Sequence, residues 1–167
     1  MEHPMKVLVT AASRHGATQE IAEAIGRTLD GEGVTASVAA IEDVGDPSEY
    51  DAVVLGSAVY MGRWLDSATK FVESRGSALS SRPTWLFSSG PIGDPPRPNE
   101  SQAVDVDDVV SKTQAKGHKL FAGKLDKGKL GFGERAVMLA FRAAEGDYRD
   151  WHEVEAWARA IAGELRR

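Results

Sequence analysis

Short apolar runs alternate along this chain with longer stretches whose apolar residues recur every three or four positions. Runs of strand length occupy residues 6–10, 34–40, 51–57, 84–87 and 119–123. Helical spacing or composition marks the segments 18–30, 64–73, 105–112, 134–144 and 150 onward. Because strands that alternate with helices form parallel sheets covered on both faces, the pattern predicts an α/β domain.

Two helices have clear boundaries in the sequence. The first places a single apolar face on Ile21, Ala24, Ile25, Thr28 and Leu29, and Gly31 and Gly33 follow it as stop signals. The last opens on Asp150-Trp-His-Glu153, an acidic residue three positions before a glutamate, which is the pattern of a capping box.

Three polar, glycine-containing segments follow predicted strands, at residues 10–18, 57–64 and 88–93. In an open parallel sheet, ligands bind beyond the carboxyl ends of the strands. We therefore expect these three segments to form the functional site together.

The first of these segments favours an anion. It carries the hydroxyls of Thr10, Ser13 and Thr18, it turns at Gly16, and it leads into a helix whose first N–H groups lack partners. It matches neither the dinucleotide fingerprint nor the Walker loop. A phosphate monoester fits such a loop, and a capped turn without a ligand is the alternative.

The other two segments offer walls for a flat ring. Tyr60 can stack on a heterocycle, whereas we expect Trp64 to pack beneath its loop. The third segment has hydroxyls and two glycines, Gly90 and Gly93, which allow backbone N–H groups to come close to a ring.

With these features the chain resembles a known family. Residues 13–18 resemble the phosphate loop of flavodoxins, which bind FMN. Residues 10–20, residues 56–72 and the tail from 119 to 151 resemble the flavodoxin-like, quinone-linked protoporphyrinogen oxidases of bacteria. The resemblance implies a flavodoxin-like three-layer α/β sandwich with a five-stranded parallel sheet in the order 2-1-3-4-5.

The resemblance also implies where FMN binds. The phosphate lies on the first segment, at Thr10, Ser13, Arg14, His15, Gly16, Ala17 and Thr18. The ring lies against the second and third segments, at Ala58, Val59, Tyr60, Met61, Gly62, Ser88, Ser89, Gly90, Pro91, Ile92 and Gly93. No side chain stands out as a catalytic acid or base, so no catalytic residue is assigned.

Composition narrows the chemistry. The 167 residues suit one domain, 1–167, and they include no cysteine, so any redox chemistry needs a bound cofactor. The four histidines lack metal-ligand spacing, which predicts no metal site. With no export signal or membrane span in the sequence, we expect a cytoplasmic protein that binds no nucleic acid.

The net charge of −5 is unevenly distributed. Most of the basic excess lies in residues 112–142, where a solvated surface is the simple interpretation. The alternative is a peripheral contact with the inner face of the membrane, where quinones reside. Residues 134–144 have two corresponding interpretations: a buried helix, or a short amphipathic contact with lipid.

These observations predict an FMN-dependent oxidoreductase that oxidises protoporphyrinogen IX, with a quinone as electron acceptor. One alternative is a flavodoxin that carries electrons to a redox partner protein. Another is a flavodoxin-like module that binds a partner and holds no cofactor.

Overall fold

The protein is described by a computed structural model, which covers residues 5–13, 16–60, 63–90, 106–121, 124–125, 146–147 and 149–166. The main sheet has the order β2-β1-β3-β5-β6, and the short strand β4 pairs with β3. Its strands are β1 (Lys6–Ala12), β2 (Thr35–Ala40), β3 (Ala52–Tyr60), β4 (Arg63–Trp64), β5 (Thr84–Ser89) and β6 (Gly117–Phe121). All neighbours along the main path are parallel, as the alternating sequence pattern predicts.

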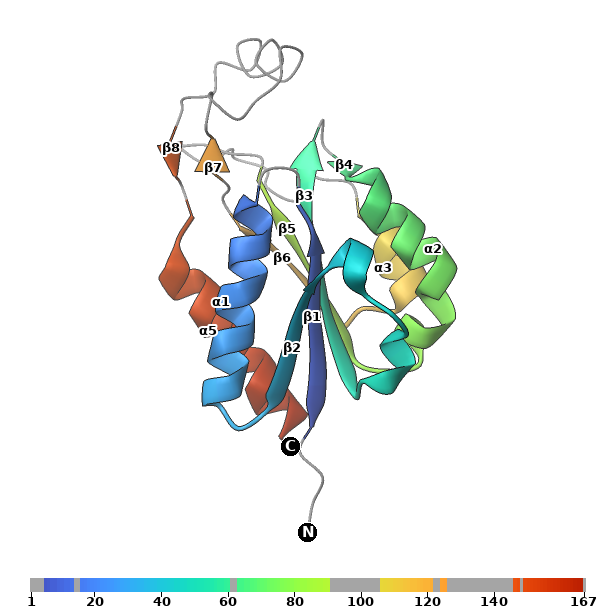
Figure 1. The fold of residues 1–167 in the computed structure, drawn as a ribbon, viewed down its shortest axis with the longest axis horizontal. Helices are drawn as coiled ribbons and strands as arrows, with labels where there is room; N and C mark the ends of the chain where they lie inside the picture. The colour runs from blue at the N-terminus through green and yellow to red at the C-terminus, as the bar shows by residue number, and fades with distance from the viewer. Residues whose placement is uncertain are drawn as a thin grey trace.

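Helices cover both faces of the sheet (Figure 1). One face packs against α1 (Ala17–Gly31) and α5 (Trp151–Leu165), and the other against α2 (Asp66–Ser80) and α3 (Asp107–Thr113). Two 3-10 turns, Ile41–Asp43 and Pro47–Glu49, connect β2 to β3, and β7 (Lys124–Leu125) pairs with β8 (Gly146–Asp147). The predicted three-layer flavodoxin-like fold and its strand order are confirmed.

Alternation along β1 builds both halves of the core. Val7, Val9 and Ala11 contribute to the α1–α5 side, whereas Leu8 and Ala12 contribute to the α2–α3 side. All five side chains are almost completely buried. A strand of this kind needs apolar residues at nearly every position, which explains the continuous apolar runs in the sequence.

One glycine is required by close packing under the α1–α5 side. Gly56 of β3 is the register partner of Phe87 of β5, and a Cβ on Gly56 would lie 2.2 Å from Cζ of the Phe87 ring. That ring also meets Phe121 and Trp157, with centroid distances of 6.0 and 6.1 Å. The aromatic cluster fixes α5 onto the strands that end at the predicted site.

Several element ends differ from the sequence prediction. β1, β3 and β5 run to Ala12, Tyr60 and Ser89, beyond the ends predicted at residues 10, 57 and 87. The predicted loop residues Ala58, Val59, Tyr60, Ser88 and Ser89 are therefore strand residues. Small and polar residues resemble a turn in the sequence, but here backbone pairing continues through them, as between Ala58 and Ser89.

The second helix is also longer than predicted, because α2 reaches Ser80 rather than residue 73. Its last turns are rich in serine, a residue that often favours turns. Here the hydroxyls of Ser74 and Ser80 donate to the carbonyl oxygens of Phe71 and Ser77, each at 3.2 Å, and so satisfy themselves within the helix. β6 likewise spans Gly117–Phe121 rather than residues 119–123.

Candidate flavin site

The carboxyl ends of β1, β3 and β5 lie side by side. Ala12 pairs with Ser57, Ser57 with Ser88, and Ala58 with Ser89. The structure therefore brings the described parts of the three predicted segments to one edge of the sheet, at the top in Figure 1. Seven predicted positions lie outside the described residues: Arg14, His15, Met61, Gly62, Pro91, Ile92 and Gly93.

The first segment leaves the start of α1 open. Gly16 is the N-cap residue, with φ of 90°, and its N–H donates to Ser13 Oγ at 3.0 Å. No side chain among the described residues caps α1. The N-cap of α5 is different, because Asp150 Oδ1 accepts from the N–H groups of His152 and Glu153 at 3.0 and 3.2 Å. The open start of α1 thus retains N–H donors and a positive dipole end for an anion.

Two threonines of the first predicted segment are buried. Thr18 lies in the first turn of α1 with 2% of its surface exposed, and Thr10 of β1 is completely buried. The Thr10 hydroxyl has no hydrogen-bond partner among the described residues. A buried hydroxyl without a partner is rare in folded proteins. Thr10 alternates with Val9 and Ala11, so it lies on the α2–α3 side of β1 with Leu8 and Ala12, on the face opposite α1. Of the two threonines, only Thr18 lies at the open helix start.

The second segment is part of a hairpin in which β3 pairs antiparallel with β4. Ser57 Oγ accepts from the Leu65 N–H at 3.0 Å and donates to the Ala58 carbonyl at 2.8 Å. Trp64 is buried in the α2–α3 core, which confirms that it packs under its loop. This hydroxyl therefore fixes the base of the segment that was predicted to face the ring.

A hydrogen-bonded chain crosses the α2–α3 side of the sheet edge. Trp64 Nε1 donates to Ser88 Oγ at 2.8 Å, and this oxygen lies 2.7 Å from His118 Nε2. Burial lowers the pKa of His118 below its ordinary value of 6.5. The neutral ring can accept the Ser88 hydroxyl hydrogen, so the three side chains fix the end of β5 and the hairpin relative to each other.

The third segment turns immediately after β5. Gly90 has φ of 71°, in the left-handed region, and its N–H donates to the Phe121 carbonyl at 3.0 Å. Its positive φ explains why a glycine stands at this point of the predicted ring-binding segment.

Arg149 was missed in the sequence because its partners are far away along the chain. Its Nη1 donates to the Ala17 carbonyl at 3.2 Å and to Glu20 Oε1 at 3.1 Å. Its guanidinium also lies over the Trp151 ring, 4.7 Å from the centroid. The only signal in the sequence was its place directly before the Asp150 helix cap. His118 was missed for a similar reason, since its partner is on a neighbouring strand.

Two lysines in the described part of the basic stretch pair with acids. Lys112 lies 3.0 Å from Asp108 and 3.6 Å from Glu73, and Lys119 lies 3.0 Å from Glu153. Residues 126–145, which include the predicted helix 134–144, lie outside the described residues. Contact of residues 112–142 with a membrane stays a prediction.

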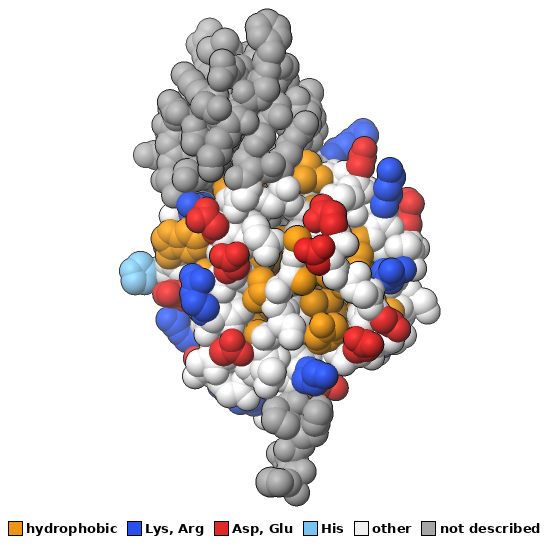
Figure 2. Space-filling model, in the orientation of Figure 1, with side chains coloured by type: hydrophobic (Ala, Val, Ile, Leu, Met, Phe, Trp, Pro, Cys, Tyr) orange, Lys and Arg blue, Asp and Glu red, His pale blue; other side chains and the backbone are white. Residues whose placement is uncertain are grey.

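The described residues contain no group of three or more His, Cys, Asp or Glu side chains that could hold a metal ion. Within the same ranges, no helix combines the length and apolar character needed to cross a membrane. On the face shown in Figure 2, acidic and basic side chains are intermingled.

A parallel sheet in this order, with an open helix start after its first strand, defines the flavodoxin-like class of α/β proteins. The chain belongs to the flavodoxin domain family, whose model matches residues 8–151. Membership of this family implies a flavin cofactor, and the donors at the start of α1 fit the phosphate of FMN.

Among curated proteins, the chain is similar to protoporphyrinogen IX dehydrogenase [quinone] of Escherichia coli strain K12. The two are 26% identical over 172 residues, which cover 95% of each. The protein of that name from Escherichia coli O157:H7 matches equally well, at 26% identity and 95% of each chain.

Among solved structures, a flavodoxin from the domain Archaea has a TM-score of 0.66 at 18% identity, covering 98% of this chain and 100% of that one. A flavodoxin of Streptococcus pneumoniae TIGR4 has a TM-score of 0.62 at 19% identity, covering 95% and 99%. At these identities the likeness concerns the fold.

Proposed function

We propose that this protein is an FMN-dependent oxidoreductase that oxidises protoporphyrinogen IX with a quinone as electron acceptor. The observation that carries the cofactor half of the proposal is the open start of α1. Gly16 supplies a tight left-handed turn, and no described side chain occupies the N–H donors that Asp150 occupies in α5. A phosphate at this point gains both the donors and the helix dipole.

Residues 13–18 would hold the phosphate, and residues 58–62 and 88–93 would enclose the ring. When bound, FMN supplies the redox chemistry that a chain without cysteine cannot supply from its own side chains. The protein's own contribution is positioning. Ser57 fixes the hairpin base, and the chain from Trp64 through Ser88 to His118 fixes the end of β5 against it.

The substrate half of the proposal is supported by the extent of the similarity to the Escherichia coli protein. That similarity covers 95% of both chains and so includes the C-terminal tail. Arg149, near the end of that tail, contacts the first turn of α1. This contact supports a role for the tail beside the predicted phosphate segment, beyond that of an electron carrier.

The first experiment asks whether the protein binds FMN. Purified protein, stripped of flavin, is titrated with FMN and with riboflavin, and flavin fluorescence and the absorbance spectrum are recorded. We expect tight binding of FMN and much weaker binding of riboflavin, because riboflavin lacks the phosphate. Protein that stays colourless with both would contradict the proposal and favour the cofactor-free interaction module.

The second experiment asks about the substrate. The FMN-loaded protein is incubated anaerobically with protoporphyrinogen IX and a menaquinone analogue, and porphyrin fluorescence is followed. We expect porphyrin to form only when both protein and quinone are present. No porphyrin, with rapid electron transfer to a flavodoxin reductase instead, would favour the electron carrier.

A further inference from the structure

Arg149 occupies an unusual electrostatic position. Its side chain is only 4% exposed, and it lies directly before Asp150, the N-cap of α5. Its Nη1 reaches the carbonyl of Ala17, the first residue of α1. Because α1 and α5 run in the same direction (Figure 1), the guanidinium lies where two helices begin.

A cation at this place is unfavourable by itself. The start of a helix carries a partial positive charge, so it stabilises anions and destabilises cations. A buried guanidinium also loses solvation, which only close partners replace. Asp150 is engaged by the N–H groups of α5, so its carboxylate already offsets the dipole of that helix.

Glu20 is the anion that Arg149 contacts at the start of α1, at 3.1 Å. Glu20 lies in the first turn, and its own N–H bonds to the Gly16 carbonyl at 3.1 Å. Its carboxylate, which is 54% exposed, stabilises the helix start when no ligand is present. The same carboxylate repels a phosphate that binds within one turn of it.

We propose that Arg149 is a positioning residue of the phosphate site, which neutralises Glu20 and ties the C-terminal tail to the first turn of α1. The proposal rests on the proposed function, since it assumes that FMN binds at residues 13–18. Through this contact, binding of the phosphate stabilises the docked start of α5, and the docked start of α5 strengthens binding of the phosphate. The Trp151 ring, stacked at 4.7 Å, holds the guanidinium in place from the tail side.

The test compares FMN with riboflavin in Arg149→Gln protein. We expect the dissociation constant for FMN to rise about tenfold and that for riboflavin to change less than twofold, because only FMN carries the phosphate. In about 1 M salt the loss of FMN affinity shrinks, because charge repulsion is screened over a few ångströms. A purely structural role would weaken both flavins and would not respond to salt.

A second variant tests whether the loss of FMN affinity comes from the Glu20 charge or from general damage to the protein. In Glu20→Gln/Arg149→Gln protein, the repelling carboxylate is also removed, and we expect most of the FMN affinity to return. The matched control is Arg159→Gln, which removes an arginine from the same α5 helix where it is half-exposed, and which should leave the ratio of the two affinities unchanged.

The outcomes distinguish the two proposals. If wild-type protein prefers FMN and Arg149→Gln retains the same preference, the role of Arg149 is wrong while the proposed function stands. A double variant as weak as the single one overturns the neutralisation of Glu20. If wild-type protein binds neither flavin, the proposed function fails and this inference fails with it.

Discussion

The two ends of the α1–α5 helix pair carry arginines in opposite settings. At the amino ends, Arg149 is 4% exposed and holds Ala17 and Glu20. Around Glu32, which follows the carboxyl end of α1, Arg159 from the middle of α5 and Arg166 from its end are each 50% exposed, and the Glu32 side chain is 33% exposed. The arginine is thus buried beside the candidate site and half-exposed away from it.

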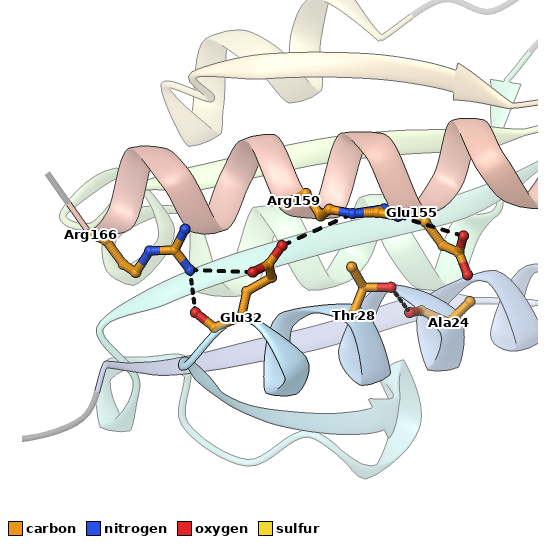
Figure 3. A network of polar contacts seen from close by, with 6 residues as sticks. All are labelled: Ala24, Thr28, Glu32, Glu155, Arg159 and Arg166. Carbon is orange, nitrogen blue, oxygen red and sulfur yellow. Dashed lines mark hydrogen bonds and ion pairs between the residues drawn. The ribbon is translucent and has the colours of Figure 1, made fainter.

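Figure 3 shows the exposed end. Arg159 lies 4.0 Å from Glu32 and 3.9 Å from Glu155, and Arg166 lies 3.8 Å from the Glu32 carboxylate. Arg166 also donates to the Glu32 carbonyl, which helps to satisfy the end of α1. Exposed pairs of this kind contribute about 0–1 kcal/mol, because water screens them and ordering the side chains costs entropy. Burial of the arginine, rather than the number of ion pairs, therefore distinguishes the two ends.

The largest expected effect is on FMN affinity, and it distinguishes a threonine near the start of α1 from one near its end. We expect Thr18→Val to weaken FMN binding about 10- to 100-fold, because a hydroxyl that bonds a charged phosphate is worth about 1.5–3 kcal/mol. Thr28→Val is the control, since the Thr28 hydroxyl donates to the Ala24 carbonyl of its own helix at 2.9 Å. Fluorescence titration checks both. Equal FMN affinity in the two variants would contradict the phosphate site.

The next effect concerns the capped start of α5. We expect Asp150→Ala to lower the free energy of unfolding by about 1 kcal/mol, since two N–H groups lose their acceptor. Asp150→Asn keeps a cap oxygen and should differ from wild type by only a few tenths of a kcal/mol. Urea denaturation measures both. A fully stable Asp150→Ala protein would show that the cap does not distinguish α5 from α1.

A smaller expected effect is on the pH dependence of stability, and it compares a partly buried histidine with an exposed one. Because burial lowers the pKa of His118 below 6.5, protonation favours the unfolded chain. Stability is then complete above about pH 6.5 and falls as the pH drops from 6.5 through the lower folded-state pKa. We expect His118→Gln to flatten this decline, measured by urea denaturation between pH 7.5 and 5, and the exposed His152, changed to Gln, to leave it unaltered. An unchanged decline in the His118 variant would exclude this histidine as its source.

The smallest effect is at the exposed carboxyl ends. We expect Arg159→Gln to change the free energy of unfolding by less than about 0.5 kcal/mol, and the change to diminish further in high salt. Thermal unfolding at low and high salt tests this. A loss above about 1 kcal/mol would show that the network in Figure 3 stabilises the helix pair after all.

The fold followed from periodicity, because each apolar face had enough residues to identify it, as with Ile21, Ala24 and Ile25 in α1. The ends of the strands could not be predicted in this way, because Ala58 and Ser89 look like loop residues until their pairing partners are known. In the site, Gly16 and Thr18 were predicted from one local segment, because the turn glycine and the hydroxyl both stand where the helix begins. Arg149 and His118 could not be predicted, since their partners come from other elements.

The aromatic cluster of Phe87, Phe121 and Trp157 also orders events during synthesis. Phe87 and Phe121 belong to β5 and β6, whereas Trp157 belongs to α5, the last described element of the chain. A growing chain therefore has its whole parallel sheet before it has the second of the two helices that cover one face. Until α5 emerges, the part of that face beside α1 stays uncovered, and Arg149 is not in place. The cofactor edge can be completed only when the rest of the fold is already built.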